Sequence, residues 1–395
     1  MNDIISAIKQ VSHQCGEQDV FLQWRLSMLA YAEALPKENK EKFSYGLGII
    51  SAIPHAKVFG ISESPYSYKW GEAPTGVSIM SWNDVMKDSA LTAKIFSLFE
   101  AQKQTLSSNY FFALSAALFS DGLVVLVDKG VSADIILETK IPASGADMLI
   151  VFAGAHSRIA VRETFSFETV NAGDIKGRTV FIVAEEKARV TYAEKSRALS
   201  QGLFFINRKV FAEDSAHVSL VEASGYGAGF FKSETTAFLD GEKSKANLVT
   251  FAETDGTAVC DNLATVFHRA DGTVSNIFSV GTASGLSKII YRSLIHVPKH
   301  THAAVGRQEG NFLMLSSGAE IDAIPSLEVA SDDSKTSHAL SVRRLSEESL
   351  FYPRTRGFPA KDAESLIVRG LVDHALAGAL SDKRTDLFSS ESLLG

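Results

Sequence analysis

The chain has 395 residues, 45% of them hydrophobic and 22% charged, which is enough for two or three domains or for one large domain with helical appendages. It has no run of about 18 apolar residues that would span a membrane, and Asp3 interrupts any apolar signal segment, so we expect a cytoplasmic protein. The net charge of −7 argues against nucleic-acid binding, and two cysteines, Cys15 and Cys260, provide neither a disulfide framework nor an intrachain zinc or cluster site.

Residues 1–115 predict an N-terminal helical region. Phe21, Leu22, Leu26 and Leu29 recur at helical spacing, and Pro36 ends the pattern. A second helical pattern covers residues 81–104. We interpret this region as a helical cap rather than as a catalytic barrel.

Residues 116–344 predict a mainly β core. Short β-type runs are separated by Gly, Asp, Asn or Ser, and the units recur about every 20 to 25 residues. Too few helix-length segments separate these runs for a doubly wound α/β sheet. The repetition favours a β-helix or β-solenoid, in which each coil stacks on the next, and a β-sandwich is the alternative.

Residues 345–395 predict a C-terminal helical region. Ser346 is placed to cap a helix that Pro353 would end, and a longer helix begins at Pro359. One stripe of this second helix is apolar and comprises Ala363, Leu366, Ile367, Leu371, Ala375 and Leu376. Such a helix covers the end of the solenoid or offers its face to a second protein.

Familiar catalytic motifs are absent from the sequence, so we expect a protein that is not an enzyme. The segment GYGAGFFKS, which starts at Gly225, places Phe231 where a phosphate-binding loop needs glycine, so it is interpreted as a turn between β runs. His300 and His302 would share one face of a strand, but nothing near them completes a metal site. Cys260 is interpreted as a core thiol.

His338 is the most distinctive candidate ligand. It lies in the short alternating run KTSHALSV, between the predicted solenoid and the terminal helices. Neutral imidazole is a good ligand for iron, copper or zinc. The alternative is a histidine that is hydrogen-bonded in the last coil.

The segment from Asn311 to Gly370 resembles the signature of the SufB/SufD family of iron–sulfur cluster assembly proteins, and weaker matches extend upstream over most of the chain. The family pattern includes a proline followed by Leu-Glu, an Asp-Asp pair, a Ser-His pair, Leu-Phe-Tyr and Arg-Gly. The matching residues here are Asn311, Leu313, Leu315, Ser316, Pro325, Leu327, Glu328, Asp332, Asp333, Ser337, His338, Leu350, Phe351, Tyr352, Arg356, Gly357, Ala363 and Gly370.

The resemblance implies a right-handed parallel β-helix with N-terminal and C-terminal helical regions. It also implies a non-catalytic subunit of a SufB–SufC–SufD scaffold, with a SufB-like paralogue and the SufC ABC ATPase as partners, or a homodimer when isolated. The SufD branch fits better, because Gly310 stands near the place of a SufB scaffold cysteine and Ala339 replaces the glutamate that follows the SufB histidine.

The resemblance further implies roles for individual residues. His338 would bind iron of a transient iron–sulfur cluster opposite a cysteine of the partner, with no cofactor held by the isolated chain. Thr336 stands where the family often has a cysteine. The SufC dock would comprise Arg354, Arg356, Leu366, Ile367 and Leu371.

Two other functions compete with this interpretation. A carbohydrate-active parallel β-helix enzyme would need a groove of convergent carboxylates, whereas the acidic residues here are dispersed among turns. A purely structural interaction partner would bury His338 in its core.

Overall fold

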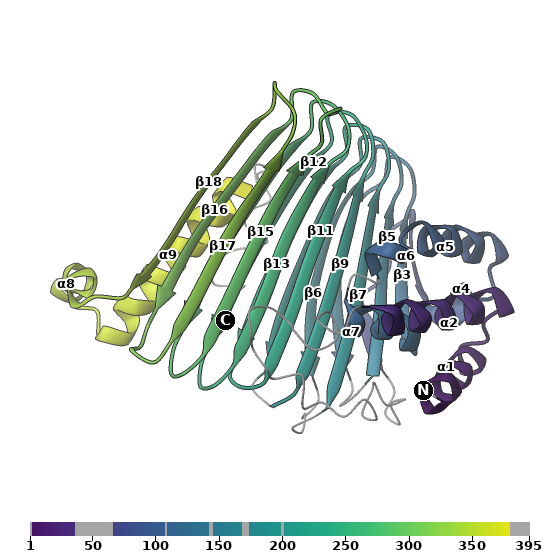
Figure 1. Ribbon diagram of the computed structural model, residues 1–395, viewed down its shortest axis with the longest axis horizontal. Coiled ribbons are helices and arrows are strands. Elements are labelled where there is room, and N and C mark those ends of the chain that lie inside the picture. The colour runs from purple at the N-terminus through teal and green to yellow at the C-terminus, as the bar shows by residue number, and fades with distance from the viewer. Residues whose placement is uncertain are drawn as a thin grey trace.

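The computed structural model describes residues 2–35, 66–106, 109–141, 145–167, 174–198 and 201–379. Two long sheets run side by side as the walls of a parallel β-solenoid, with helices at either end of the chain (Figure 1). The mainly β class and the solenoid are therefore confirmed, and the β-sandwich alternative is wrong.

Each sheet contains nine strands within the described residues, and each coil of the solenoid contributes one strand to each sheet. In sheet order, sheet A comprises β1 (Ser67–Trp70), β4 (Ser132–Ile141), β6 (Arg158–Phe167), β8 (Arg189–Ala198), β10 (His217–Tyr226), β12 (Lys245–Thr254), β14 (Val274–Ala283), β16 (Val305–Met314) and β18 (Lys335–Arg344). Sheet B, here in chain order, comprises β2 (Val77–Ser81), β3 (Asp121–Val127), β5 (Gly145–Ala153), β7 (Ile175–Ala184), β9 (Leu203–Ala212), β11 (Phe230–Leu239), β13 (Val259–His268), β15 (Lys288–Val297) and β17 (Glu320–Val329). Only β1 and β2 pair antiparallel with their neighbours; the pairing among β3–β18 is parallel.

The repeat is longer than the sequence indicated. Val218 and Ala246 are Cα partners in adjacent coils, so one coil advances the chain by 246 − 218 = 28 residues. The prediction of 20 to 25 residues was wrong because it followed the spacing of β runs and turns without assigning each run to one of two sheets. The segment GYGAGFFKS does contain a turn, between the end of β10 at Tyr226 and the start of β11 at Phe230.

Equivalent turns between the sheets stack through one left-handed residue each. His156, Lys187, Ser215 and Lys243 all have φ between 56° and 60°. The N–H of each donates to a carbonyl of the next turn: that of Lys187 to Asp214 and that of Ser215 to Glu242, both at 2.8 Å. These hydrogen bonds continue the ladder of the sheets through the turns and keep successive coils in register.

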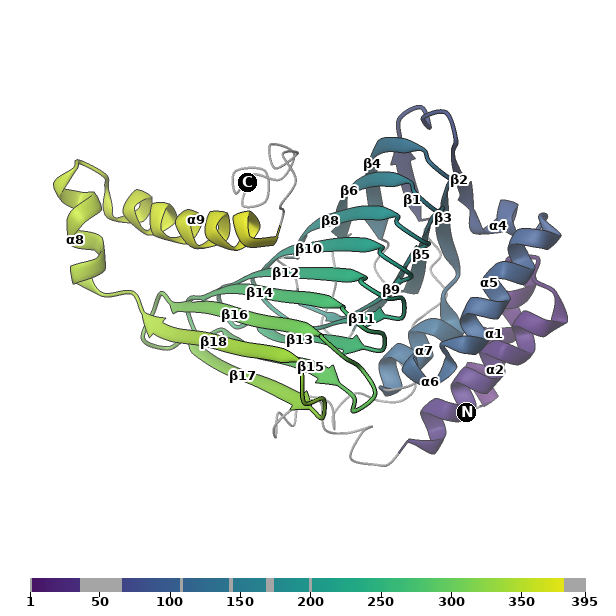
Figure 2. The ribbon, with the colours of Figure 1, turned by 90° about the horizontal axis from the view of Figure 1, so that it is seen from above.

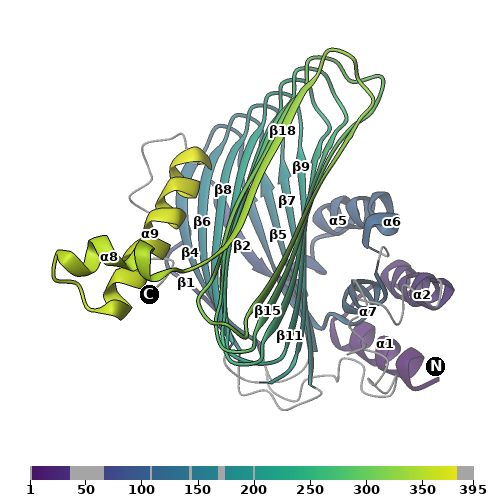
Figure 3. The same ribbon diagram turned by 60° about the vertical axis from the view of Figure 1, so that its left-hand side comes forward.

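The N-terminal helices pack on the outer face of sheet B at the start of the solenoid (Figure 3). They are α1 (Asn2–Gln14), α2 (Asp19–Ala34), α4 (Trp82–Val85), α5 (Ser89–Ala101), α6 (Lys103–Leu106) and α7 (Tyr110–Leu118). Aromatic rings join the two layers: Phe111 stacks on Phe205 at 4.3 Å between ring centroids, and Phe99 lies 5.7 Å from Phe181. Sheet B is thus buried on both faces near the N-terminus, which is why its first strands read as continuous apolar runs.

The chain leaves the solenoid at Arg344 and forms α8 (Glu347–Thr355) and α9 (Ala360–Ala379). Ser346 caps α8 as predicted, because its hydroxyl accepts from the N–H of Ser349. The prediction that Pro353 ends this helix was wrong: α8 continues to Thr355, so the proline removes only one hydrogen bond within its last turn. Helix α9 returns along the outer face of sheet A (Figure 2).

Candidate functional site

The solenoid ends at an open edge among the described residues. β18 is the last strand of sheet A and β17 the last of sheet B, and neither has a neighbour on its outer side. The interior side chains of the last coil are therefore exposed to a degree not found in earlier coils; Val329 and Val342 are 39% and 41% exposed. An uncovered strand edge beside apolar side chains is a template for pairing with another chain.

His338 lies on this open end. It is the fourth residue of β18, and its Cα partner is Gln308 of β16. Gln308 is buried and donates to the carbonyl of Ser326, across the solenoid in β17, at 2.9 Å. His338 occupies the same position in its own strand but is exposed, because no further coil covers it. The alternative of a histidine buried in the core is therefore wrong.

A complete metal site is not found within the described part of the chain, where no group of three or more His, Cys, Asp or Glu side chains is placed to hold an ion. His338 thus offers one imidazole, and a metal bound there would need further ligands from outside the chain. Thr336, two residues before it, is half-buried and brings no thiol.

His300, His302 and Cys260 were the other candidate ligands in the sequence. His300 is in the turn between β15 and β16, so the prediction that it shares a strand face with His302 was wrong. His302 instead places Nδ1 3.5 Å from Oδ1 of Asp333 in the adjacent turn. Cys260 is fully buried, as predicted, and burial raises the pKa of its thiol well above the usual value.

The C-terminal helices expose a second apolar surface. Phe351 and Tyr352 on α8 are 67% and 65% exposed, and Leu366 on α9 is 46% exposed. Arg354 pairs with Glu347 at 3.0 Å, and the guanidinium of Arg356 lies over the Tyr352 ring.

The predicted stripe of α9 divides between two environments. Leu371 packs with Val372, Ala375 and Leu376 against apolar residues of sheet A, and Ala363 is fully buried. Ile367 is half-buried, and Leu366 faces solvent. The helix therefore covers the solenoid with one side and leaves Leu366 available beside α8.

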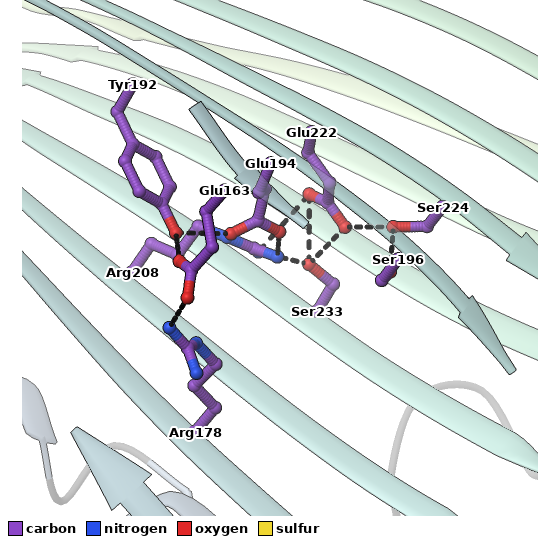
Figure 4. Close-up of polar contacts among 9 residues, drawn as sticks. All are labelled: Glu163, Arg178, Tyr192, Glu194, Ser196, Arg208, Glu222, Ser224 and Ser233. Atoms are coloured by element: carbon purple, nitrogen blue, oxygen red, sulfur yellow. Dashed lines mark hydrogen bonds and ion pairs between the residues drawn. The ribbon is translucent and has the colours of Figure 1, made fainter. Parts of the chain in front are cut away.

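The interior of the solenoid holds a network of charged side chains (Figure 4). Arg178 in β7 contacts Asp147 at 2.5 Å and Glu163 at 2.6 Å. The Tyr192 hydroxyl donates to the other oxygen of Glu163 at 2.6 Å and thereby joins this pair to the next coil, where it lies 3.1 Å from Glu194.

A second arginine continues the network. Arg208 pairs with Glu194 and places Nη1 3.2 Å from Glu222 and 2.7 Å from the Ser233 hydroxyl. Ser233 in turn donates to Glu222 at 2.9 Å. Burial raises the pKa of Glu222, and the nearby charge of Glu194 adds to that rise, whereas Arg208 opposes it.

Comparison with known proteins decides the family. Residues 136–371, more than half of the chain, match the family model described as "SUF system FeS cluster assembly, SufBD core domain". The chain belongs to the SufBD family.

Curated relatives carry the same family name. An "Iron-sulfur cluster assembly SufBD family protein" of Staphylococcus epidermidis is 25% identical over 293 residues, which cover 72% of this chain and 63% of the relative. Proteins of the same description from Staphylococcus haemolyticus and Staphylococcus aureus are 25% and 24% identical over the same shares. This SufBD family chain thus spans less than two thirds of the length of these relatives. No helix among its described residues is long and apolar enough to cross a membrane.

Family membership confirms the resemblance, but sequence reasoning missed the interior network. Its signal was present: Glu163, Glu194 and Glu222 recur at intervals of 31 and 28 residues, close to the coil length. Each lies on the inner side of its strand, although a glutamate in a strand is usually assigned to the solvent face.

Proposed function

We propose that this chain is a non-catalytic, SufD-like subunit of a scaffold on which iron–sulfur clusters are assembled. Its partners would be a SufB-like paralogue, paired at the open end of the solenoid, and a SufC-type ABC ATPase, docked on the C-terminal helices. Membership of the SufBD family supports the assembly role. The absence of a cysteine at Gly310 and the presence of Ala339 favour the SufD branch.

The observation that carries the proposal is the place of His338. A single exposed imidazole in the last coil, beside unpaired strand edges, fits a ligand that is completed by a thiolate of a second solenoid. The nascent cluster is cargo of the complex, so the isolated chain holds no cluster. A carbohydrate-active enzyme is not favoured, since the buried carboxylates lie inside the solenoid and pair with arginines.

We expect His338→Ala to lower the iron and sulfide content of the assembled complex by more than half without dissociating it, because one ligand is lost while the strand edges remain. The measurement is co-expression with candidate SufB-like and SufC-like chains, anaerobic purification, and assay of bound iron and sulfide. His302→Ala is the matched control, an exposed histidine in a neighbouring turn, and it should retain wild-type iron. Unchanged iron in His338→Ala would refute the ligand role, and failure of the wild-type chains to associate would refute the scaffold.

Docking of the SufC-type ATPase on the C-terminal helices predicts that a substitution there weakens binding of the ATPase rather than of the cluster. Leu366→Asp places a charge on the exposed apolar side of α9 and should weaken capture of the SufC-type subunit about tenfold or more. Pairing with the SufB-like chain should stay intact. Ser365→Asp introduces the same charge at the adjacent exposed position and should bind normally. Equal capture of both variants in a pull-down titration would remove Leu366 from the dock.

A further inference from the structure

The outer face of sheet A is strongly basic over two neighbouring strands, β6 and β8. Side chains alternate along each strand, so the inward Glu163 leaves the even-numbered places of β6 for the outside, and the inward Glu194 leaves the odd-numbered places of β8. Five of these outward side chains are cationic and none is acidic, in a chain whose net charge is −7. We call these five the basic face: Arg158, Arg162, Arg189, Lys195 and Arg197.

The strand register brings these cations together. Arg158 and Arg189 are Cα partners on adjacent strands, and like charges placed opposite each other destabilise a sheet. Arg189 and Arg197 are exposed, and the other three are half-buried. Arg197 extends over β10, because a Cβ added at Gly225 would lie 3.5 Å from its Cγ. The glycine therefore leaves room for a guanidinium to lie across the neighbouring strand.

The borders of the basic face are also defined. At the start of β10, burial lowers the pKa of His217 to about 4, and the charges of Arg189 and Lys245 on either side lower it further, so this imidazole is neutral between two cations. Helix α9 contacts β12 and β14, and its Val372, Ala375 and Leu376 share one apolar cluster with Ala193 of β8 and with Val221 and Ala223 of β10. The glutamates on the inner side of β6 and β8 pair with Arg178 and Arg208, and on the neighbouring strand β4 the exposed Asp134 and Glu138 border the basic face.

We propose that the basic face binds an acidic, extended segment of a partner protein. Along a strand, alternate side chains stand about 6.6 Å apart, which is also the spacing of alternate side chains in an extended peptide. Four of the five cations are arginines, whose planar guanidinium groups take carboxylates in bidentate pairs. Thr164, Ser166 and Thr191 lie between them and add hydroxyl donors.

Charge favours a short acidic segment over nucleic acid. A long polyanion such as nucleic acid would extend past the basic face onto the rest of the protein surface. Because the chain has a net charge of −7, that surface would repel the polyanion and oppose binding. A segment of a few carboxylates stays within the local positive field. The basic face is separate from the open end of the solenoid and from the exposed residues of α8. The proposal therefore does not depend on the assembly function.

The test uses the full chain and a fluorescein-labelled peptide of alternating glutamate and serine, followed by fluorescence anisotropy at two ionic strengths. The double variant Arg189→Ser/Arg197→Ser should weaken binding about tenfold, equivalent to ~1.4 kcal/mol. Both side chains are exposed, so circular dichroism should show an unchanged fold. Lys87→Ser/Lys187→Ser removes the same charge from exposed lysines elsewhere and should bind as the wild type does.

Three results would overturn the proposal. Unaltered binding in the arginine variant would show that the basic face is not the site. An equal loss in the lysine control would show that only net charge matters. Tighter binding of a single-stranded oligonucleotide of the same charge would assign the surface to nucleic acid instead. Retained affinity in Arg189→Lys/Arg197→Lys would support charge attraction, and a partial loss would support bidentate pairing as well.

Discussion

Substitution of Arg208 by methionine should lower the free energy of unfolding by about 3–5 kcal/mol, the cost of breaking a buried ion pair by removing one partner. Arg208 is fully buried inside the solenoid between Glu194 and Glu222. Methionine fills a similar volume but leaves the two carboxylates together without a cation. Ser233 would remain as a donor to Glu222, which is too little to offset a second buried negative charge.

Urea unfolding, followed by circular dichroism, measures this loss. Arg269→Met is the matched control, because Arg269 forms an exposed pair with Asp240 and its removal should cost at most about 1 kcal/mol. Adding Glu194→Gln to the Arg208→Met chain should recover part of the lost stability, since one of the two unpaired charges disappears. Equal midpoints for Arg208→Met and Arg269→Met would contradict the assignment of Arg208 as the central cation.

The fold was predictable in kind because its pattern is repeated, whereas the length of one coil was not. A coil contains two strands, and sheet B is covered by Phe99 and Phe111 on its outer side, so the alternation that marks a strand's inner face is lost there. Without a clean alternation, the spacing of turns was the only repeat that the sequence offered for estimating the length of a coil. Turns occur twice in each coil, at unequal intervals.

The sequence allowed prediction of individual site residues but not of their surroundings in the fold. His338 was identified from its neighbours in sequence, but its exposure depends on β18 being the last strand of sheet A, which is a property of the whole stack. For α9, the apolar stripe left a choice between covering the solenoid and meeting a partner. In the structure the stripe serves both environments, because Leu371 packs against sheet A and Leu366 faces solvent.

The charged network inside the solenoid makes the stability of the fold depend on pH. Burial outweighs the attraction of Arg178 and raises the pKa of Asp147 from 3.8 to about 7, with Glu163 and Asp121 adding to the rise. A carboxyl whose pKa is higher in the folded state takes up a proton on folding, so its contribution to stability is full below pH ~4 and is lost as pH rises through 7.

We therefore expect the wild type to lose stability relative to Asp147→Asn between pH 5 and pH 8, by on the order of 2–3 kcal/mol. The asparagine cannot ionise, yet its carbonyl still accepts from Arg178, and the carboxyls of Asp121 and Glu222 titrate in both chains, so their contributions largely cancel in the difference. Urea unfolding at successive pH values measures this difference in the free energy of unfolding.

Asp84→Asn is the control with the opposite sign. Hydrogen bonds from Lys87 and Ser81 lower the pKa of exposed Asp84, so any contribution of this carboxyl to stability is lost as pH falls. Parallel pH curves for the wild type and Asp147→Asn would mean that Asp147 is ionised inside the solenoid throughout this range and that Arg178 compensates fully for its burial.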